Sequence, residues 1–131
     1  MAKLSLKYTA NTKGIVIYYA WLMFNIMLIS IKKLSIIQQH FHQVFTHTSN
    51  FIITAILMSA VSLIWLLQGA PYKFVLWLGM VAIVLNFVVE LFIPVLNTPD
   101  IIDAVYGTVG VLITLLVMLH FKTVGLQNRE Q

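Results

Sequence analysis

The sequence predicts an all-α membrane protein, a polytopic transmembrane bundle of four helices plus one amphipathic interfacial helix. Of its 131 residues, 60% are hydrophobic and only 9% are charged, and the mean hydropathy is +0.94. Soluble domains carry about 25% charged residues, so this chain has too little charge to cover a surface that faces water. Its apolar residues also gather in four long runs. We therefore expect a single membrane domain over residues 1–131.

Each apolar run has roughly the 20 residues that an α-helix needs to cross the bilayer core. Lipid offers no hydrogen-bond partners to backbone amides, so a spanning segment must be a helix or a strand of a closed barrel. Barrel strands are about 10 residues long and alternate apolar with polar residues, whereas these runs are longer and apolar on all sides. The predicted transmembrane helices cover about residues 14–31, 51–68, 74–96 and 101–121.

The connection between the first two runs is predicted to form an amphipathic helix over about residues 33–47. Large apolar residues recur there at helical spacing, and glutamine, histidine and threonine fill the other face. Such a helix lies in the membrane interface with its apolar face toward lipid. A disordered loop is the alternative, but it would leave the apolar side chains in water. These side chains belong to Leu34, Ile37, Phe41, Val44 and Phe45.

The basic residues predict the orientation in the membrane. The N-terminal segment, the 69–73 turn and the C-terminal tail fall on one side of a four-helix arrangement, and the opposite side holds only Lys32 and Lys33. The side richer in lysine and arginine faces the cytoplasm. Both termini are therefore expected in the cytoplasm, with the 33–47 helix on the outer face. The six basic residues of the cytoplasmic side are Lys3, Lys7, Lys13, Lys73, Lys122 and Arg129.

Three of the four acidic residues, Glu90, Asp100 and Asp103, fall within fourteen positions at the outer ends of the third and fourth runs. They are therefore expected to meet in space. Glu90 lies six residues before the end of its run, a depth of about 9 Å at 1.5 Å per residue. A charge at that depth is costly unless it is paired or reaches water, so Glu90 is either part of a functional site or an interfacial anchor. Pro94 offers no amide to the carbonyl of residue 90 and predicts that the helix bends or stops.

The start of the fourth helix has a capping pattern. Thr98 is predicted as the N-cap and Pro99 as the first helical residue, with Asp100 in the first turn, where an acid suits the helix dipole. Capping explains Asp100, whereas Asp103 lies a turn deeper and is expected in a polar site near Tyr106. The predicted ligand-binding residues are Glu90, Asp100, Asp103 and Tyr106.

One side of the fourth helix carries small residues, which let helices approach closely. We interpret this side as a packing surface of the bundle. It comprises Ala104, Gly107, Thr108, Gly110 and Thr114.

Several kinds of chemistry find no support in the sequence. The absence of cysteine excludes disulfides, thiol catalysis and cysteine metal sites. His40 and His42 are two positions apart and do not share a helix face. With His47 they lack the i, i+4 spacing or the third close ligand of a zinc site. We therefore expect no metal and no other cofactor. No nucleic-acid motif is present. An enzyme is the class with the least support, because no catalytic constellation is visible.

The segment from Glu90 to Gly110 resembles the last two helices of the VanZ-like family of small bacterial membrane proteins. The resemblance rests on an acid near the end of the third helix, a proline a few residues later, and an aspartate and two glycines that open the fourth. Glu90, Pro94, Asp103, Gly107 and Gly110 fit this order. The arginine that the family places before the aspartate is absent, and a tyrosine stands where asparagine is usual.

The resemblance implies a multi-pass protein of the bacterial inner membrane with a role in the cell envelope and in antibiotic resistance. The first functional hypothesis is that an outer-facing polar site binds a lipid or a glycopeptide-related ligand. The second is a small oligomeric transporter or ion-conducting protein, with Glu90 as the proton carrier. The third is a non-catalytic scaffold or accessory subunit. The expected partners are the lipid bilayer and either a second copy of the chain or another membrane protein, with no nucleic acid.

Overall fold

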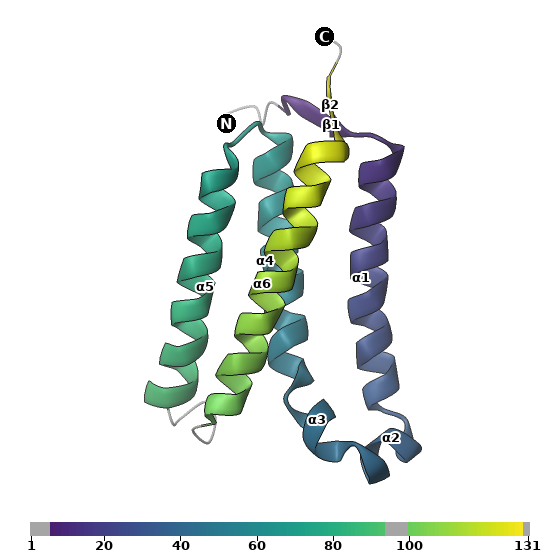
Figure 1. Cartoon of the computed structure of the whole chain (residues 1–131), viewed down its shortest axis with the longest axis vertical. Coiled ribbons are helices and arrows are strands. Elements are labelled where there is room, and N and C mark those ends of the chain that lie inside the picture. The colour runs from purple at the N-terminus through teal and green to yellow at the C-terminus, as the bar shows by residue number, and fades with distance from the viewer. Residues whose placement is uncertain (1–5, 94–99, 130–131) are drawn as a thin grey trace, which may run out of the picture.

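The protein is a bundle of four long helices, which confirms the predicted all-α membrane fold. The computed structural model describes residues 6–93 and 100–129. The helices α1 (Thr12–Lys32), α4 (Thr48–Leu67), α5 (Tyr72–Phe92) and α6 (Ile101–Val124) run side by side along the molecule (Figure 1). In length and apolar composition all four are able to cross a membrane. Large side chains such as Trp77 and Leu116 point away from the bundle, at 61% and 67% exposure, as expected for surfaces that contact lipid.

The small side of α6 is the packing surface of the bundle, as predicted. Helix α6 contacts α1, α4 and α5, and its contact with α4 is the most extensive. Gly107 and Gly110 are buried, and a Cβ atom added at Gly110 would stand only 2.7 Å from the Phe51 carbonyl oxygen of α4. Only glycine permits this approach of the two backbones. The same close contact brings the first turn of α6 beside the start of α4.

The two ends of the described chain are joined by a short sheet that the sequence pattern did not indicate. Strand β1 (Tyr8–Ala10) pairs antiparallel with β2 (Leu126–Asn128), with Tyr8 opposite Asn128. The Lys7 amide also donates to the Leu67 carbonyl at 2.9 Å, which ties β1 to the end of α4. Three-residue strands are too short to produce a recognisable alternation of polar and apolar residues. We call the bundle end that carries β1 and β2 the strand end.

A helical segment between the first two spans, predicted over about residues 33–47, is confirmed, but it is divided in two. The structure has two short helices, α2 (Ser35–His40) and α3 (His42–Thr46), separated by Phe41 with φ −128° and ψ 23°. His47, with φ −84° and ψ −9°, then leads into α4. The chain must turn from α2 into the direction of α4, and the break at Phe41 accommodates this turn (Figure 1). Apolar side chains of the segment remain exposed, including Leu34 at 56% and Val44 at 50%, so they are available to lipid.

A buried hydrogen bond joins α1 to α4 and provides a test of the packing. Trp21 Nε1 donates to Ser59 Oγ at 3.0 Å. Replacing Trp21 with phenylalanine keeps an aromatic ring but removes the donor, and we expect a loss of about 1 kcal/mol in the free energy of unfolding. Thermal or denaturant unfolding of the purified protein in detergent measures this loss. Trp77→Phe, at a 61% exposed position, is the matched control, and an equal loss in both variants would contradict the assignment.

Candidate functional site

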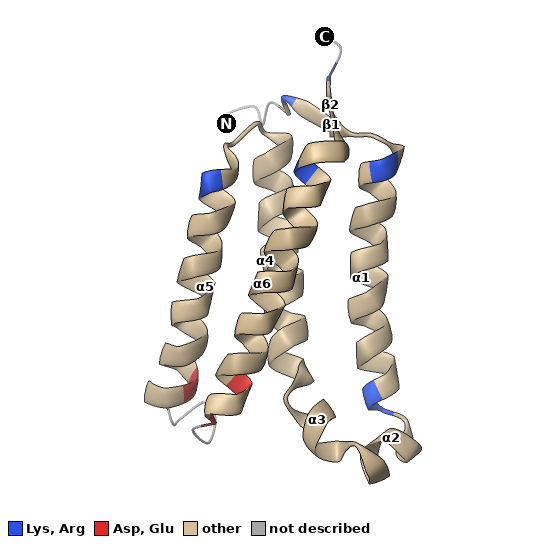
Figure 2. Cartoon of the chain, in the orientation of Figure 1, with Lys and Arg blue, Asp and Glu red and all other residues tan. Residues whose placement is uncertain are grey.

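All three described acidic residues lie at the bundle end opposite the sheet. Glu90 belongs to the last turn of α5, and Asp100 and Asp103 belong to the start of α6. These helix ends lie next to the beginning of α4, at the end that also carries α2 and α3 (Figure 1). Figure 2 shows the acidic residues there and most of the lysine and arginine residues toward the strand end. We call this end, with its acidic side chains, the acidic end.

Asp100 is the N-cap of α6. Its backbone is extended, with φ −139° and ψ 104°, and its Oδ1 accepts a hydrogen bond from the Ile102 amide at 2.8 Å. The capping role predicted for Asp100 is confirmed, but as the cap itself and not as an acid of the first turn. The helix begins at Ile101, so the cap lies two residues later than predicted. Thr98 and Pro99, predicted as the cap and the first helical residue, lie outside the described residues.

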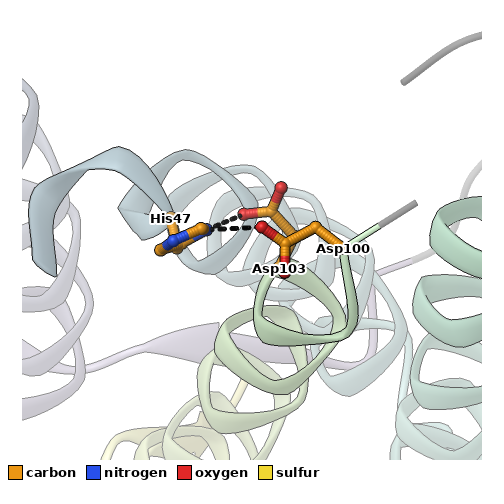
Figure 3. A group of neighbouring side chains, drawn as sticks. All are labelled: His47, Asp100 and Asp103. Atoms are coloured by element: carbon orange, nitrogen blue, oxygen red, sulfur yellow. Dashed lines mark hydrogen bonds and ion pairs between the residues drawn. The ribbon is translucent and has the colours of Figure 1, made fainter. Parts of the chain in front are cut away.

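His47 faces the two aspartates of α6 (Figure 3). Its Nδ1 lies 2.8 Å from Asp103 Oδ1 and 3.5 Å from Asp100 Oδ2. In the tautomer with its proton on Nδ1, the imidazole donates to these carboxylates, which only accept hydrogen bonds when ionised. The side chains of His47 and Asp103 are each 16% exposed, and that of Asp100 is 33% exposed. The contact spans 56 positions of sequence and links the start of α4 to the first turn of α6.

Tyr106 lies beside this group on the next turn of α6. Its ring is tilted by 48° to the His47 ring, with the ring centres 5.6 Å apart. Tyr106 also packs against the buried cluster that contains Trp21 and Phe51. It therefore forms the apolar wall behind the imidazole and fixes the orientation of the ring.

Glu90 is buried, with 6% exposure, although it lies close to the end of its helix. Its Oε1 accepts a hydrogen bond from Asn50 Nδ2 of α4 at 2.9 Å. Glu90 lies two residues before the end of its helix and not six, because α5 ends at Phe92 and Ile93 has a non-helical φ of −117° and ψ of 72°. A following proline disfavours the helical conformation of the preceding residue, and the sequence places Pro94 there. The prediction that the helix stops near Pro94 is confirmed.

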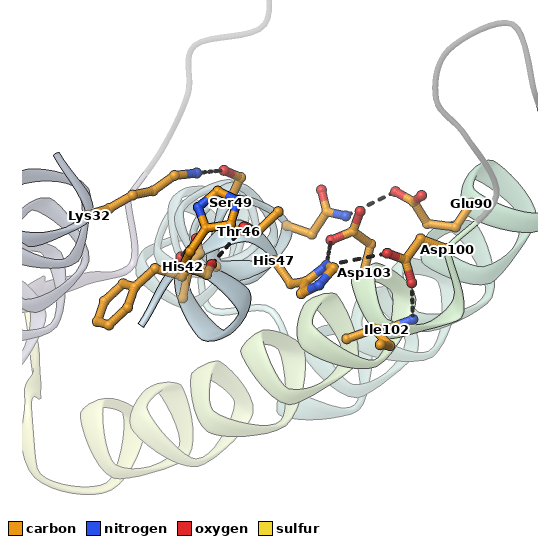
Figure 4. Close-up of polar contacts among 12 residues, drawn as sticks. Lys32, His42, Thr46, His47, Ser49, Glu90, Asp100, Ile102 and Asp103 are labelled. Carbon is orange, nitrogen blue, oxygen red and sulfur yellow. Dashed lines mark hydrogen bonds and ion pairs between the residues drawn. The ribbon is translucent and has the colours of Figure 1, made fainter. Parts of the chain in front are cut away.

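The acidic end thus combines the four residues predicted from the sequence with His47, the N-cap of α4, and Asn50 of α4. Figure 4 shows the polar contacts among them, together with the bond from Lys32 Nζ to Ser49 Oγ that ties the end of α1 to α4. Sequence reasoning missed His47 and Asn50. Their spacing of three residues places them on one face of a helix that starts with polar residues, which was the available signal. His40 and His42 are exposed and take no part in this group.

This arrangement offers acceptor and ligand atoms in a partly sheltered position. The atoms His47 Nδ1, Asp100 Oδ2 and Asp103 Oδ1 lie within 4.8 Å of one another, which is close enough for a single metal ion to contact all three. Carboxylates also bind amines and hydroxyl groups of an organic ligand. The site therefore suits a ligand with positive charge or several hydrogen-bond donors.

No protein-family model matches this sequence, and searches of curated proteins and of solved structures found no match.

Proposed function

We propose that this protein is a bacterial inner-membrane protein of the VanZ-like type that binds a lipid or glycopeptide-related ligand at the acidic end of its bundle. The observation that carries the proposal is the meeting of Glu90, Asp103 and His47 at one end of the bundle, where α5 ends and α4 and α6 begin. Packing of a membrane bundle does not require ionisable side chains, which are costly in lipid and are retained chiefly for function.

The geometry supports a ligand that enters from the membrane surface. The side chains of His47 and Asp103 are neither fully buried nor fully exposed, and Asp100 is more exposed than both. The exposed apolar residues of α2 and α3, such as Ile36 at 68%, lie on the same end of the bundle. A lipid-linked molecule would place its acyl part against these apolar residues and its polar head beside the carboxylates.

The orientation of the site follows from the charge distribution. Lys13, Lys73 and Lys122 belong to helix ends at the strand end, whereas Lys32 and Lys33 are at the acidic end. The more basic end is cytoplasmic under the positive-inside rule. The proposed site therefore faces the outer side of the inner membrane, where envelope precursors and glycopeptides are present.

The proposal is tested by complementation with the double variant Glu90→Gln and Asp103→Asn. In a strain where deletion of the gene changes antibiotic susceptibility, we expect the wild-type gene to restore the susceptibility profile and the double variant to leave it at the level of the deletion. Both substitutions keep side-chain size and one acceptor oxygen, which can retain the contacts to Asn50 and His47, so the variant should accumulate in the membrane like the wild type. Membrane abundance and the melting temperature in detergent check this.

Glu130→Gln is the matched control, because it makes the same chemical change at the one acid that follows β2 in the sequence. It should complement fully. Full complementation by the double variant would contradict the proposal and would assign Glu90 and Asp103 to packing and capping in a membrane scaffold.

A further inference from the structure

We propose that His47, Asp100 and Asp103 form a binding site for a divalent metal ion of the zinc type. This goes beyond ligand binding at the acidic end, and it does not depend on an envelope role. Three ligand atoms, His47 Nδ1, Asp100 Oδ2 and Asp103 Oδ1, lie within 4.8 Å of one another. They come from the start of α4 and from the N-cap and first turn of α6.

The separations of the ligand atoms suit such an ion. Donor atoms about 2.0–2.1 Å from a tetrahedral zinc ion lie roughly 3.3 Å from one another. The distance from His47 Nδ1 to Asp100 Oδ2 is 3.5 Å, and that to Asp103 Oδ1 is 2.8 Å. Nδ1 faces both carboxylates at once (Figure 3), so an ion in place of the Nδ1 proton would contact all three side chains.

The two oxygens of Asp100 have separate partners. Oδ1 accepts the Ile102 amide at 2.8 Å and caps α6, while Oδ2 faces His47. The cap fixes the carboxylate without using the oxygen that faces the imidazole. The Tyr106 ring, 5.6 Å from the His47 ring, restricts the imidazole in the same way. Hydrogen bonds and packing that orient ligand side chains are a regular feature of metal sites.

The composition of the site selects the type of ion. Magnesium and calcium prefer sets of oxygen ligands, whereas an imidazole nitrogen with carboxylate oxygens suits zinc and neighbouring transition metals. Two carboxylates and one imidazole bring two negative charges, which balance a divalent cation. Three protein ligands leave at least one coordination position of a zinc ion open for water or for an anionic oxygen.

Isothermal titration calorimetry of the full chain in detergent tests this inference, after treatment with a chelator, with zinc chloride as the titrant. We expect one saturable zinc site per chain, and no comparable heat from magnesium or calcium. His47→Ala and Asp103→Asn should each weaken zinc binding by at least about tenfold, since even the loss of residues that only orient ligands weakens metal affinity by 10–100-fold.

Two further variants separate metal binding from folding. Asp100→Asn keeps a side chain that caps helices well but removes the charge, so it should preserve the melting temperature of the metal-free protein while weakening zinc binding. His42→Ala removes an exposed histidine outside the site and should leave zinc binding unchanged.

The inference is overturned if the wild type shows no saturable zinc binding, or if His42→Ala weakens binding as much as His47→Ala does. It is also overturned if Asp100→Asn and Asp103→Asn both bind zinc like the wild type. None of these outcomes depends on the susceptibility assay.

Discussion

A valine in place of Gly110 is expected to destabilise the bundle by about 1–3 kcal/mol, the range for overpacking a well-packed interior. The added Cβ would stand 2.7 Å from the Phe51 carbonyl oxygen and 3.2 Å from the Phe51 Cα. Both atoms belong to the backbone of α4, so the strain cannot be relieved by a change of rotamer. The two helices must separate, and the contact that places the first turn of α6 beside α4 is weakened.

Unfolding of the variant in detergent, followed by helical circular dichroism over a denaturant series, measures this effect. Ala60→Val is the matched control, because it also introduces a valine into the bundle but at an exposed position of α4. It should leave the free energy of unfolding within about 0.5 kcal/mol of the wild type. A Gly110→Val protein as stable as the control would show that α4 and α6 are not in close contact.

The four helices could be predicted from the sequence because their signal is strong and local. A run of about 20 apolar residues is stable in lipid as an α-helix, which satisfies its own backbone hydrogen bonds. Each of the four runs has this length and composition. The ends of the helices are less predictable, since they depend on single residues. Asp100 caps α6 in place of Thr98, and α5 ends at Phe92. The break at Phe41 depends on the path of the chain into α4, which no local pattern encodes.

Four of the six residues of the group at the acidic end could be predicted from the sequence, and His47 and Asn50 could not. Glu90 and Asp103 stand out because acids are rare in apolar runs. Asn50 and His47 precede a run and resemble ordinary polar residues at the water boundary. Their significance depends on partners 40 and 56 positions away, and only the packing of α4 against α5 and α6 brings these pairs together. In the sequence His47 has only His40 and His42 as neighbours of a metal-binding type, whereas its partners in the fold are aspartates from the other half of the chain.

The second large effect is expected from paired cysteines at the acidic end. The chain has no native cysteine, so each pair introduces the only thiols. His47 Nδ1 lies 2.8 Å from Asp103 Oδ1, and Asn50 Nδ2 lies 2.9 Å from Glu90 Oε1. The pairs His47→Cys with Asp103→Cys, and Asn50→Cys with Glu90→Cys, should therefore be joined by a short bismaleimide in most molecules. The control pair His47→Cys with Lys122→Cys should not react, because position 122 lies about 29 Å further along α6, at about 1.5 Å per residue.

Cross-linking of these pairs in native membranes is the most direct test of the central claim that α4, α5 and α6 bring their polar side chains together at one end of the bundle. The two pairs at the acidic end are predicted to cross-link within single chains, as detected by the unchanged monomer mass and by peptide mapping, while the control pair stays unlinked. The central claim would be contradicted if neither pair cross-links in membranes where each single cysteine reacts with maleimide. Equal cross-linking of the control pair would also contradict it.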